Sequence, residues 1–307
     1  MAKRPEQLAG VADADLSGTT ALVTGSTNGI GREAALALGR LGADLVVHGR
    51  DESAGAELVE ELHGTGADAR FIAADFASVA EVRELAATVR EETGGLDTLY
   101  NNAGGFFRES RRTELGVEYT FHVNHLAPYL LTAELLDHLN EDARVVTTAS
   151  AAHRGTSLDL ERVTEPNPSA GGWAYNHSKL ANVLFAAELS RRLDAAGRSI
   201  TSNSLHPGAI PGSGFTRFLP GPLPSLVQLL DSVPGVTSVA DGAAELLFVG
   251  VSDRTAGVTG RYFSSQRPTD PSQPGRNPDN ARRLWAESAR LLDIEEPLAE
   301  YAEAETA

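Results

Sequence analysis

The sequence predicts an α/β protein in which helices cover both faces of a doubly wound parallel sheet of about seven strands. Short apolar, β-type runs alternate with longer stretches of helical periodicity along most of the 307 residues. A glycine-rich loop also joins the first of these runs to the first helical stretch. A chain of this length can bury one large core, so we expect a single domain over residues 1–307, with its core at about 16–263.

The alternation is regular from the first strand to the last. The predicted strands are Ala21–Val23, Asp44–Val47, Arg70–Ala73, Leu96–Asn101, Arg144–Thr148, Ser199–Leu205 and Arg261–Phe263. The helices predicted between them are Arg32–Leu41, Ser53–His63, Val79–Glu92, Glu114–Leu139, Tyr175–Ala195 and Ser238–Gly250. Ligands of such sheets bind at the carboxyl ends of the strands, so functional residues are expected there.

Three segments lack this alternation. Residues 151–173 are irregular, and residues 208–235 are rich in proline and glycine. Loops of this length in compact domains are usually functional or disordered. Residues 264–307 form a polar C-terminal extension with a short helix at about Asp279–Leu292. We assign no chemistry to this extension.

The first predicted strand runs into the loop Gly25-Ser26-Thr27-Asn28-Gly29-Ile30-Gly31. Gly25 permits a tight turn, Gly29 lets the backbone approach a pyrophosphate, and Gly31 lets the helix pack closely on the strand. The free amides and the positive dipole at the start of the helix then bind phosphates. The strand–loop–helix context therefore favours a Rossmann-type dinucleotide site over an ordinary glycine turn.

A tyrosine and a lysine stand four residues apart on one predicted helix. Of the 26 basic residues only Lys3 and Lys179 are lysines, which indicates that position 179 needs a compact ammonium rather than a guanidinium. Residues four apart share a helix face, so the Tyr175 phenol and the Lys179 ammonium address the same space. A nearby cation lowers the pKa of a phenol toward working pH, as a general acid/base requires. The alternative is an incidental helical pair.

Three motifs together resemble those of the short-chain dehydrogenase/reductase family. They are Thr24-Gly25-x-x-x-Gly29-x-Gly31, Asn101-Asn102-Ala103-Gly104 and Tyr175-x-x-x-Lys179. The glycine spacing is that of the standard single-domain branch, and Asn124 and Ser150 fall where the family keeps an asparagine and a serine. The resemblance covers the chain from about residue 16 to residue 263. The stretches 123–132 and 175–193 look most like the retinol-dehydrogenase-like subgroup.

The resemblance implies hydride transfer between C4 of a nicotinamide and a substrate carbon. Tyr175 would exchange a proton with the substrate oxygen, and Ser150 would hydrogen-bond that oxygen. Lys179 would bind the nicotinamide ribose and lower the pKa of Tyr175. Asn124 would hold a water that relays protons from Lys179 toward solvent. In such an enzyme residues 208–235 would form a lid over the substrate, whereas the plainer alternative is a surface loop.

The resemblance also implies a cofactor site. Its members would be Gly25, Ser26, Thr27, Asn28, Gly29, Ile30, Gly31, Arg32, Arg50, Asp75, Phe76, Asn102, Ala103, Gly104, Tyr175, Lys179, Pro207, Gly208 and Ile210. Asp75 would accept from the adenine amino group, although it could also cap a helix. The Ile210 amide would meet the carboxamide. The family often has a threonine shortly after Pro207-Gly208, and here only Ser213 could replace it.

The end of the second strand indicates which nicotinamide cofactor binds. An acidic residue there would accept from the ribose hydroxyls and repel a 2′-phosphate, but Gly49 stands at that position and Arg50 follows it. Arg32 is a second nearby cation. Both arginines favour NADP(H), although Asp51 could pair with Arg50 and blunt the preference. NAD(H) therefore stays possible.

Composition excludes several other classes of protein. The net charge of −16 disfavours nucleic acids and anionic membranes as partners, and zero cysteines exclude disulfides and thiolate metal sites. No apolar run of about 18 residues predicts a membrane span, and the first 17 residues are too polar for a signal-peptide core, so we expect a cytoplasmic protein. The acid excess fits a salt-rich cytoplasm or GC-rich coding equally well. Five histidines lack convincing metal-site spacing, so we expect no metal; they are His122, His125, His153, His177 and His206.

The sequence leaves four questions open. The resemblance implies a small-molecule substrate that is a bulky apolar aldehyde, ketone or alcohol. Apolar residues within 208–235 indicate an apolar pocket, although they could equally seal the lid onto the body. The alternatives to an NADP(H)-dependent enzyme are an NAD-preferring alcohol dehydrogenase, a catalytically silent dinucleotide-binding protein, and a carrier of lipids. An apolar stripe that includes Leu180, Leu184 and Leu189 is either core or a subunit interface. Since this family commonly builds oligomers on that helix, we expect a homodimer or homotetramer.

Overall fold

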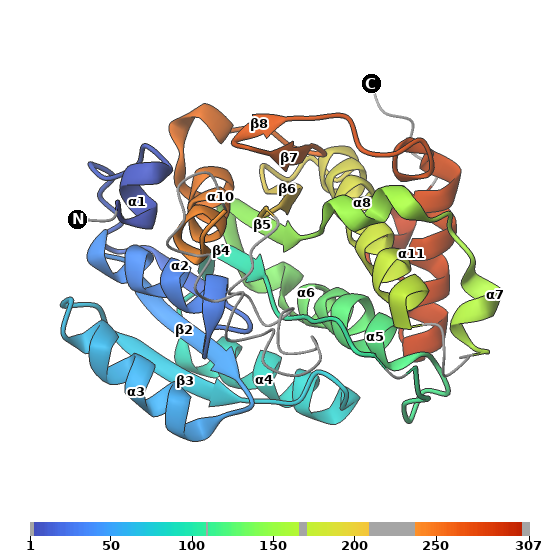
Figure 1. Cartoon of the computed structure of the whole chain (residues 1–307), viewed down its shortest axis with the longest axis horizontal. Coiled ribbons are helices and arrows are strands. Elements are labelled where there is room, and N and C mark those ends of the chain that lie inside the picture. The colour runs from blue at the N-terminus through green and yellow to red at the C-terminus, as the bar shows by residue number, and fades with distance from the viewer. Residues whose placement is uncertain (1–2, 109, 166–170, 209–236, 303–307) are drawn as a thin grey trace.

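A computed structural model describes residues 3–108, 110–165, 171–208 and 237–302, and it contains one eight-stranded sheet (Figure 1). The strand order is β3-β2-β1-β4-β5-β6-β7-β8, and all neighbours are parallel except β7 and β8. The strands are β1 (Thr20–Val23), β2 (Asp44–Gly49), β3 (Ala69–Ala73), β4 (Leu96–Asn101), β5 (Leu139–Thr148), β6 (Thr201–His206), β7 (Tyr262–Ser264) and β8 (Arg267–Pro268). The predicted doubly wound α/β fold is confirmed, with a two-residue antiparallel strand added at the edge.

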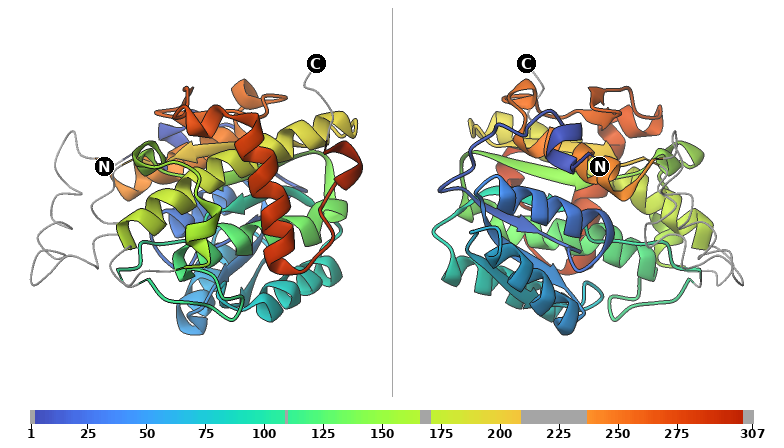
Figure 2. Two further views of the ribbon diagram at one scale, coloured as in Figure 1. Left: turned by 90° about the vertical axis from the view of Figure 1, so that its right-hand side faces the viewer. Right: turned by 60° about the vertical axis from the view of Figure 1, so that its left-hand side comes forward.

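Helices cover both faces of the sheet (Figure 2). They are α1 (Pro5–Leu8), α2 (Gly29–Arg40), α3 (Glu52–His63), α4 (Val79–Glu92), α5 (Tyr119–Phe121), α6 (Ala127–Leu135), α7 (Leu160–Val163), α8 (Gly171–Ala195), α10 (Val239–Val251) and α11 (Pro278–Leu292). Helices α2, α3 and α10 pack in one apolar core, and α4, α6, α8 and α11 pack in the other. Adjacent residues of β5, Val145 and Val146, enter opposite cores. The strands are therefore apolar on both faces, as parallel sheets require.

One predicted helix begins and ends elsewhere. The helix expected at Glu114–Leu139 begins at Tyr119, because Glu118 caps it by accepting a hydrogen bond of 2.8 Å from the Phe121 amide. Glu114 instead accepts from the Val79 amide at the start of α4. The helix passes through a π-helical turn and a short 3-10 turn, and Leu139 already belongs to β5. The helix predicted from Tyr175 begins earlier, at Gly171.

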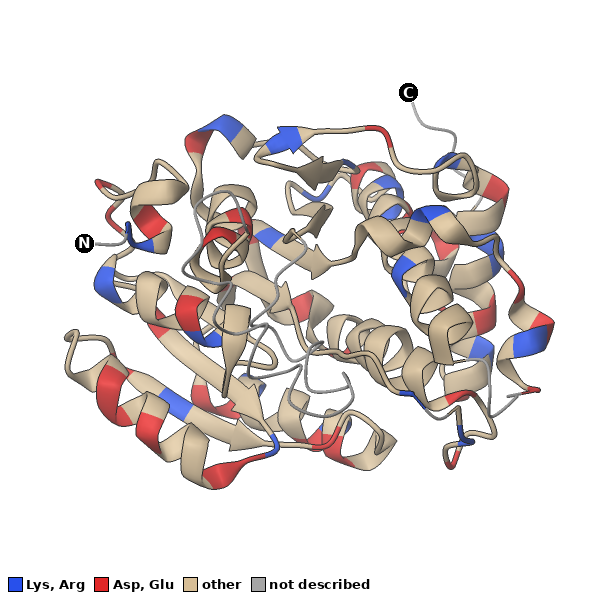
Figure 3. Ribbon diagram, viewed as in Figure 1, with Lys and Arg blue, Asp and Glu red and all other residues tan. Residues whose placement is uncertain are grey.

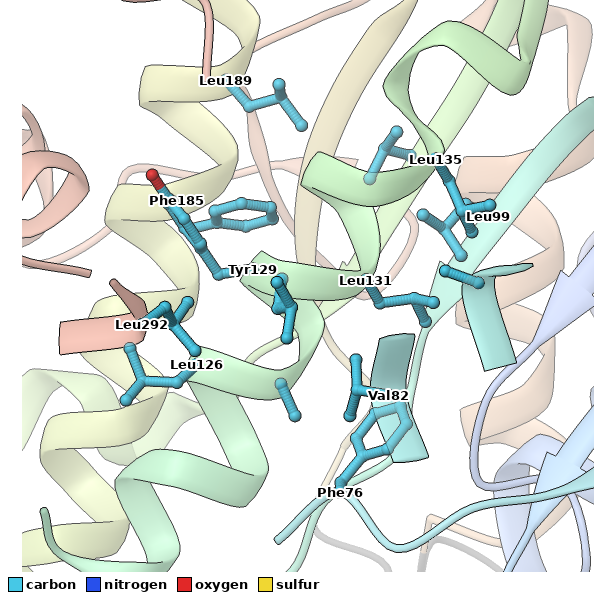
Figure 4. Close-up of a cluster of buried hydrophobic side chains, with 14 of the residues drawn as sticks. Phe76, Val82, Leu99, Leu126, Tyr129, Leu131, Leu135, Phe185, Leu189 and Leu292 are labelled. Atoms are coloured by element: carbon cyan, nitrogen blue, oxygen red, sulfur yellow. The ribbon is translucent and has the colours of Figure 1, made fainter. Parts of the chain in front are cut away.

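The C-terminal extension is packed against the body of the protein. Helix α11, red in Figure 2, lies beside α8, and the Trp285 ring stacks on Phe185 at 5.7 Å. The Tyr129 hydroxyl donates to the Trp285 carbonyl at 3.1 Å. Figure 4 shows Tyr129 and Phe185 within the apolar cluster that also takes in Leu292 of α11. The extension is thus part of the core.

The apolar stripe of α8 is core and is not available to a partner subunit. Leu180, Leu184 and Leu189 are each 0% exposed within the single chain. A homodimer or homotetramer therefore stays a prediction, and its interface would have to lie on another face. Acidic residues lie on many surface elements, α3 and α4 among them, so the net charge of −16 is spread over the molecule (Figure 3).

Candidate functional site

The loop between β1 and α2 has the geometry that its glycines predicted. Gly25 and Gly29 have φ values of +66° and +58°, in the region that favours glycine. A Cβ on Gly31 would clash with the Gly25 carbonyl oxygen and lie 2.5 Å from the Asn102 side-chain nitrogen. In the described structure the Asn28 side chain does not cap α2. The helix N-terminus can therefore offer its amides and dipole to phosphates, which fits a dinucleotide.

Thr24 and Asn102 join this loop to the end of β4. The Asn102 side chain donates to the Thr24 carbonyl at 3.0 Å. The Thr24 hydroxyl donates to the Tyr100 carbonyl and accepts from the amides of Asn102 and Ala103, each at 3.0 Å. The glycine loop and the Asn-Ala-Gly segment therefore form one rigid unit at the carboxyl edge of the sheet.

His48 is a residue of this site that the sequence analysis missed. Its Nδ1 accepts from the Gly25 amide at 3.3 Å, its Nε2 donates to the Ala74 carbonyl at 3.0 Å, and its ring stacks on Phe76. Burial lowers the pKa of His48 to about 4, so the ring is neutral and can accept at Nδ1. A polar residue inside the apolar β2 was the signal available in the sequence. Ser26 also bonds the His48 backbone, so the Ser26 and Phe76 side chains support the loop.

Buried histidines make the protein sensitive to acid. Burial lowers the pKa of His48, His122 and His177 to about 4 and that of His125 to about 3. In the unfolded chain each pKa returns to about 6.5, so the unfolded state binds more protons below that pH. The stability is therefore fully present above pH about 6.5 and is lost as the pH falls toward 4.

We expect the free energy of unfolding to fall by several kcal/mol between about pH 7 and pH 5, since each affected group contributes roughly 2 kcal/mol over that range. Urea unfolding followed by circular dichroism at both pH values measures the change. His177→Phe should reduce the pH dependence. Equal stability at the two pH values would contradict the assignment of neutral buried imidazoles.

The four predicted catalytic residues meet where β5 ends against α8. Ser150 follows β5, Tyr175 and Lys179 lie on α8, and Asn124 lies in the π-helical turn His122–Leu126. The Ser150 hydroxyl accepts from the Ala152 amide at 3.2 Å and shares a hydrogen bond with the Tyr175 side chain. Lys179 Nζ donates to the Thr148 carbonyl at 3.0 Å and lies 5.8 Å from the centre of the Tyr175 ring. A phenol, a hydroxyl and an amine therefore share one space beside the glycine loop.

Asn124 holds the Asn-Ala-Gly segment against this group. Its side chain bonds both backbone groups of Gly105, accepting from the amide and donating to the carbonyl at 2.9 Å. It also donates to the Ser178 hydroxyl at 3.0 Å. A Cβ on Gly104 would lie 2.8 Å from Asn124 Oδ1 and 3.7 Å from Lys179 Nζ. Glycine is thus required where the segment passes between Asn124 and Lys179.

The expected lowering of the Tyr175 pKa is not found in this arrangement. Burial raises the pKa of Tyr175, and only the hydrogen bond with Ser150 opposes that rise. Burial lowers the pKa of Lys179 to about 8, and its ammonium donates to a backbone carbonyl rather than to the phenol. The predicted lowering is wrong because desolvation of the buried Tyr175 phenol raises its pKa, and this effect outweighs that of the Lys179 ammonium, which lies 5.8 Å from the centre of the ring.

At the ribose end of the site, the two arginines predicted to bind a 2′-phosphate, Arg32 and Arg50, differ in how tightly each is held by a carboxylate. A side chain at Gly49 would clash with Thr27, so an acidic residue has no room there. Arg50 is 59% exposed and lies 3.9 Å from the Asp75 carboxylate, so it pairs with Asp75 and not with Asp51. Arg32 is bound to Glu61 of α3 at 2.6 Å. Arg50 is therefore the freer cation for a phosphate.

Some of the roles predicted for residues near the ribose end of the site differ from those in the structure, and others fall on residues that the structure does not describe. Asp75 does not cap α4, since Ser78 does, and Asp75 accepts instead from the Ala77 amide at 3.0 Å. Asp51 caps α3. Pro207 and Gly208 follow β6, with Gly208 at φ +100°, as a turn there requires. Ile210, Ser213 and nearly all of the predicted lid lie outside the described residues.

Two classes of feature are missing from the described part of the chain. Across residues 3–108, 110–165, 171–208 and 237–302, no three or more side chains of His, Cys, Asp or Glu are grouped so as to hold a metal ion. Within the same ranges no helix is both long and apolar enough to cross a lipid bilayer.

Comparisons with known proteins agree with the fold and the candidate site described above. The family profile described as short chain dehydrogenase matches residues 19–218. The chain is 37% identical to retinol dehydrogenase 13 of Homo sapiens over 304 residues, covering 92% of this chain and 87% of that protein. A solved structure of an uncharacterized protein from Mycobacterium paratuberculosis has a TM-score of 0.76 at 26% identity and covers 97% of this chain and 100% of its own. A short chain dehydrogenase from Burkholderia cenocepacia, solved with NADP, has a TM-score of 0.64 at 29% identity over 81% of this chain and 96% of its own.

Proposed function

Because the chain belongs to the short-chain dehydrogenase/reductase family, we propose that it interconverts a carbonyl compound and an alcohol with NADP(H) as the hydride carrier. The observation that carries the proposal is the hydrogen bond between Ser150 and Tyr175 beside a buried Lys179. These groups lie at the same edge of the sheet as the glycine loop. When bound there, the nicotinamide would supply or accept the hydride.

The chain's own residues would handle the substrate oxygen and its proton. Tyr175 would donate its phenolic proton to a carbonyl oxygen in reduction and remove the alcohol proton in oxidation. Ser150 would donate a hydrogen bond to the same oxygen, because its hydroxyl is held by the Ala152 amide and is directed at Tyr175. Lys179 would hold the ribose hydroxyls of the nicotinamide nucleotide. Asn124 would keep its proposed role of anchoring a relay water.

Two observations support NADP(H) over NAD(H). The Thr27 side chain fills the space in which an acidic residue at position 49 would accept from the ribose hydroxyls. Arg50 is exposed and makes only a loose ion pair of 3.9 Å, so a 2′-phosphate could attract its guanidinium away from Asp75. The relative from Burkholderia cenocepacia was solved with NADP, which agrees with this preference.

The substrate class follows from the relatives and from the predicted lid. Retinol dehydrogenase 13 and the polyprenol dehydrogenase of Mus musculus are named for apolar alcohols. Apolar residues recur within 208–235, so we propose an apolar aldehyde, ketone or alcohol as the substrate. With NADP(H) as the cofactor we expect carbonyl reduction in the cell, and we propose a cytoplasmic location.

Binding of NADPH and NADH tests the cofactor assignment. We expect wild type to bind NADPH more tightly in a fluorescence titration, and Arg50→Ala to weaken NADPH binding by roughly 10- to 100-fold without changing NADH binding, because a charge-assisted bond to phosphate is lost. Arg290→Ala, at an exposed arginine on α11, is the matched control and should change neither affinity.

The same titration, combined with an assay for carbonyl reduction, separates the proposed function from its alternatives. Equal affinities for the two nucleotides would favour an NAD-accepting alcohol dehydrogenase. Binding of NADPH without turnover of any carbonyl would favour a silent dinucleotide-binding protein. Binding of all-trans-retinal with affinity for neither nucleotide would identify the protein as a carrier.

A further inference from the structure

One buried histidine joins the C-terminal extension to Ser150. His153 is 0% exposed and lies in the 3-10 turn Ala151–Gly155, which begins directly after Ser150. Its Nδ1 bonds the Ser150 carbonyl at 2.6 Å. On the other side of the ring, the Ser272 amide donates to Nε2 at 3.0 Å. The imidazole thus bridges the serine of the site and a segment that follows it by more than one hundred residues.

These two bonds fix the tautomer of His153. A backbone amide can only donate, so the Nε2 atom that faces Ser272 must be the unprotonated acceptor. The remaining proton of the neutral ring is then on Nδ1, where it is donated to the Ser150 carbonyl. Burial lowers the pKa of His153, which favours this neutral form.

The neighbouring contacts hold the ring and the extension in place. The His153 ring packs edge-on against Tyr262 of β7 at 4.8 Å between centres. Arg154 donates to the carbonyl of Asp270, two residues before Ser272. Farther along, Gly275 lies against Val183 of α8, the helix that carries Tyr175. The extension therefore spans the serine turn and the tyrosine helix.

We propose that His153 is a positioning residue for Ser150 and that the Ser272 backbone sets the tautomer in which it acts. Ser150 is fixed from two directions: the Ala152 amide bonds its hydroxyl, and the His153 Nδ1 proton bonds its carbonyl. The His153 amide also donates to this carbonyl at 3.1 Å, so loss of the Nδ1 bond leaves the Ser150 carbonyl with one hydrogen bond instead of two and lets the Ser150 hydroxyl drift from Tyr175. This inference rests on the proposed reductase function for its kinetic consequence, but the hydrogen bonds exist independently of it.

Two substitutions at His153 separate positioning from packing. Asparagine places an amide nitrogen where histidine has Nδ1, so His153→Asn keeps the donor to Ser150. Glutamine places its amide one atom farther along, where histidine has Nε2, so His153→Gln loses that donor. We expect His153→Gln to lower kcat for NADPH-dependent reduction of all-trans-retinal by about 10-fold or more, because small misplacements of catalytic groups cost up to about 100-fold. The KM and the Kd for NADPH should stay within about twofold, and His153→Asn should recover most of the activity.

A double-mutant cycle tests the tautomer. Ser272→Pro removes the amide proton and should lower kcat in wild type, since Nδ1 is then no longer obliged to carry the proton. The same change should have no further effect in the His153→Asn background, because an amide nitrogen always donates. His138→Gln is the matched control, since His138 bonds Thr93 far from Ser150 and should leave kcat unchanged.

Hydrogen exchange of residues 150–155 gives a readout without substrate. Exchange should accelerate in His153→Gln and stay near wild type in His153→Asn. Equal acceleration in both variants, or equal losses of kcat, would reduce His153 to a packing role and overturn the proposal. A wild type with no reductase activity but the expected exchange pattern would contradict the proposed function and leave the positioning of Ser150 established.

Discussion

Tyr175→Phe is expected to lower kcat for carbonyl reduction by at least about 100-fold and up to about 10,000-fold, because it removes only the proton that general acid catalysis transfers. The phenol oxygen shares a hydrogen bond with Ser150, so its loss also leaves that hydroxyl with one partner fewer. The ring stays, so the packing of α8 and the affinity for NADPH should be unchanged. Steady-state kinetics with NADPH and all-trans-retinal, together with a fluorescence titration of NADPH, measure both quantities.

Tyr129→Phe is the matched control for this substitution. Tyr129 is also buried, and its hydroxyl donates to the Trp285 carbonyl at 3.1 Å, far from the glycine loop. Loss of that bond should lower the free energy of unfolding by about 1 kcal/mol and leave kcat unchanged. Similar activity losses in the two variants would show that Tyr175 acts through stability, and retained activity in Tyr175→Phe would remove it from the reaction.

The sequence was a good guide to the groups that the structure brings together at the candidate site. Tyr175 and Lys179 were recognisable because their spacing on a helix is a local property, and the three glycines because a tight turn and a close approach demand them. Their predicted proximity to Ser150 follows from the parallel sheet, since strand ends meet at one edge. The predicted fold class is confirmed for the same reason, because alternating local patterns determine it.

The supporting residues were not predictable in this way. His48 and His153 act through bonds to backbone groups of distant segments, Ala74 and Ser272, and such pairings are set only by the tertiary structure. The helix expected from Glu114 fails for a related reason, since that carboxylate accepts from Val79 of another helix. The pKa of Tyr175 depends on burial, which the spacing of two residues cannot reveal.

Lys179→Met is expected to abolish most of the activity while making the protein more stable. Lys179 is 4% exposed, and burial lowers its pKa to about 8 from the ordinary 10.5. The folded state therefore binds this proton less tightly than the unfolded state, so below pH about 8 the buried ammonium opposes folding by about 3 kcal/mol. The opposition fades as the pH rises from 8 to 10.5. Methionine has a similar length and no charge, and it loses only the bond to the Thr148 carbonyl, worth about 1 kcal/mol.

We therefore expect Lys179→Met to raise the free energy of unfolding by about 1 to 3 kcal/mol at neutral pH and to remove the rise in wild-type stability between about pH 8 and pH 10. The kcat should fall by about 100-fold, since the amine that would position the nicotinamide ribose is lost. Urea unfolding at several pH values and steady-state kinetics measure the two effects. A less stable, inactive variant would mean that Lys179 holds the fold together through Thr148. A more stable, inactive variant would show that the protein keeps an unfavourable buried charge because the reaction needs it.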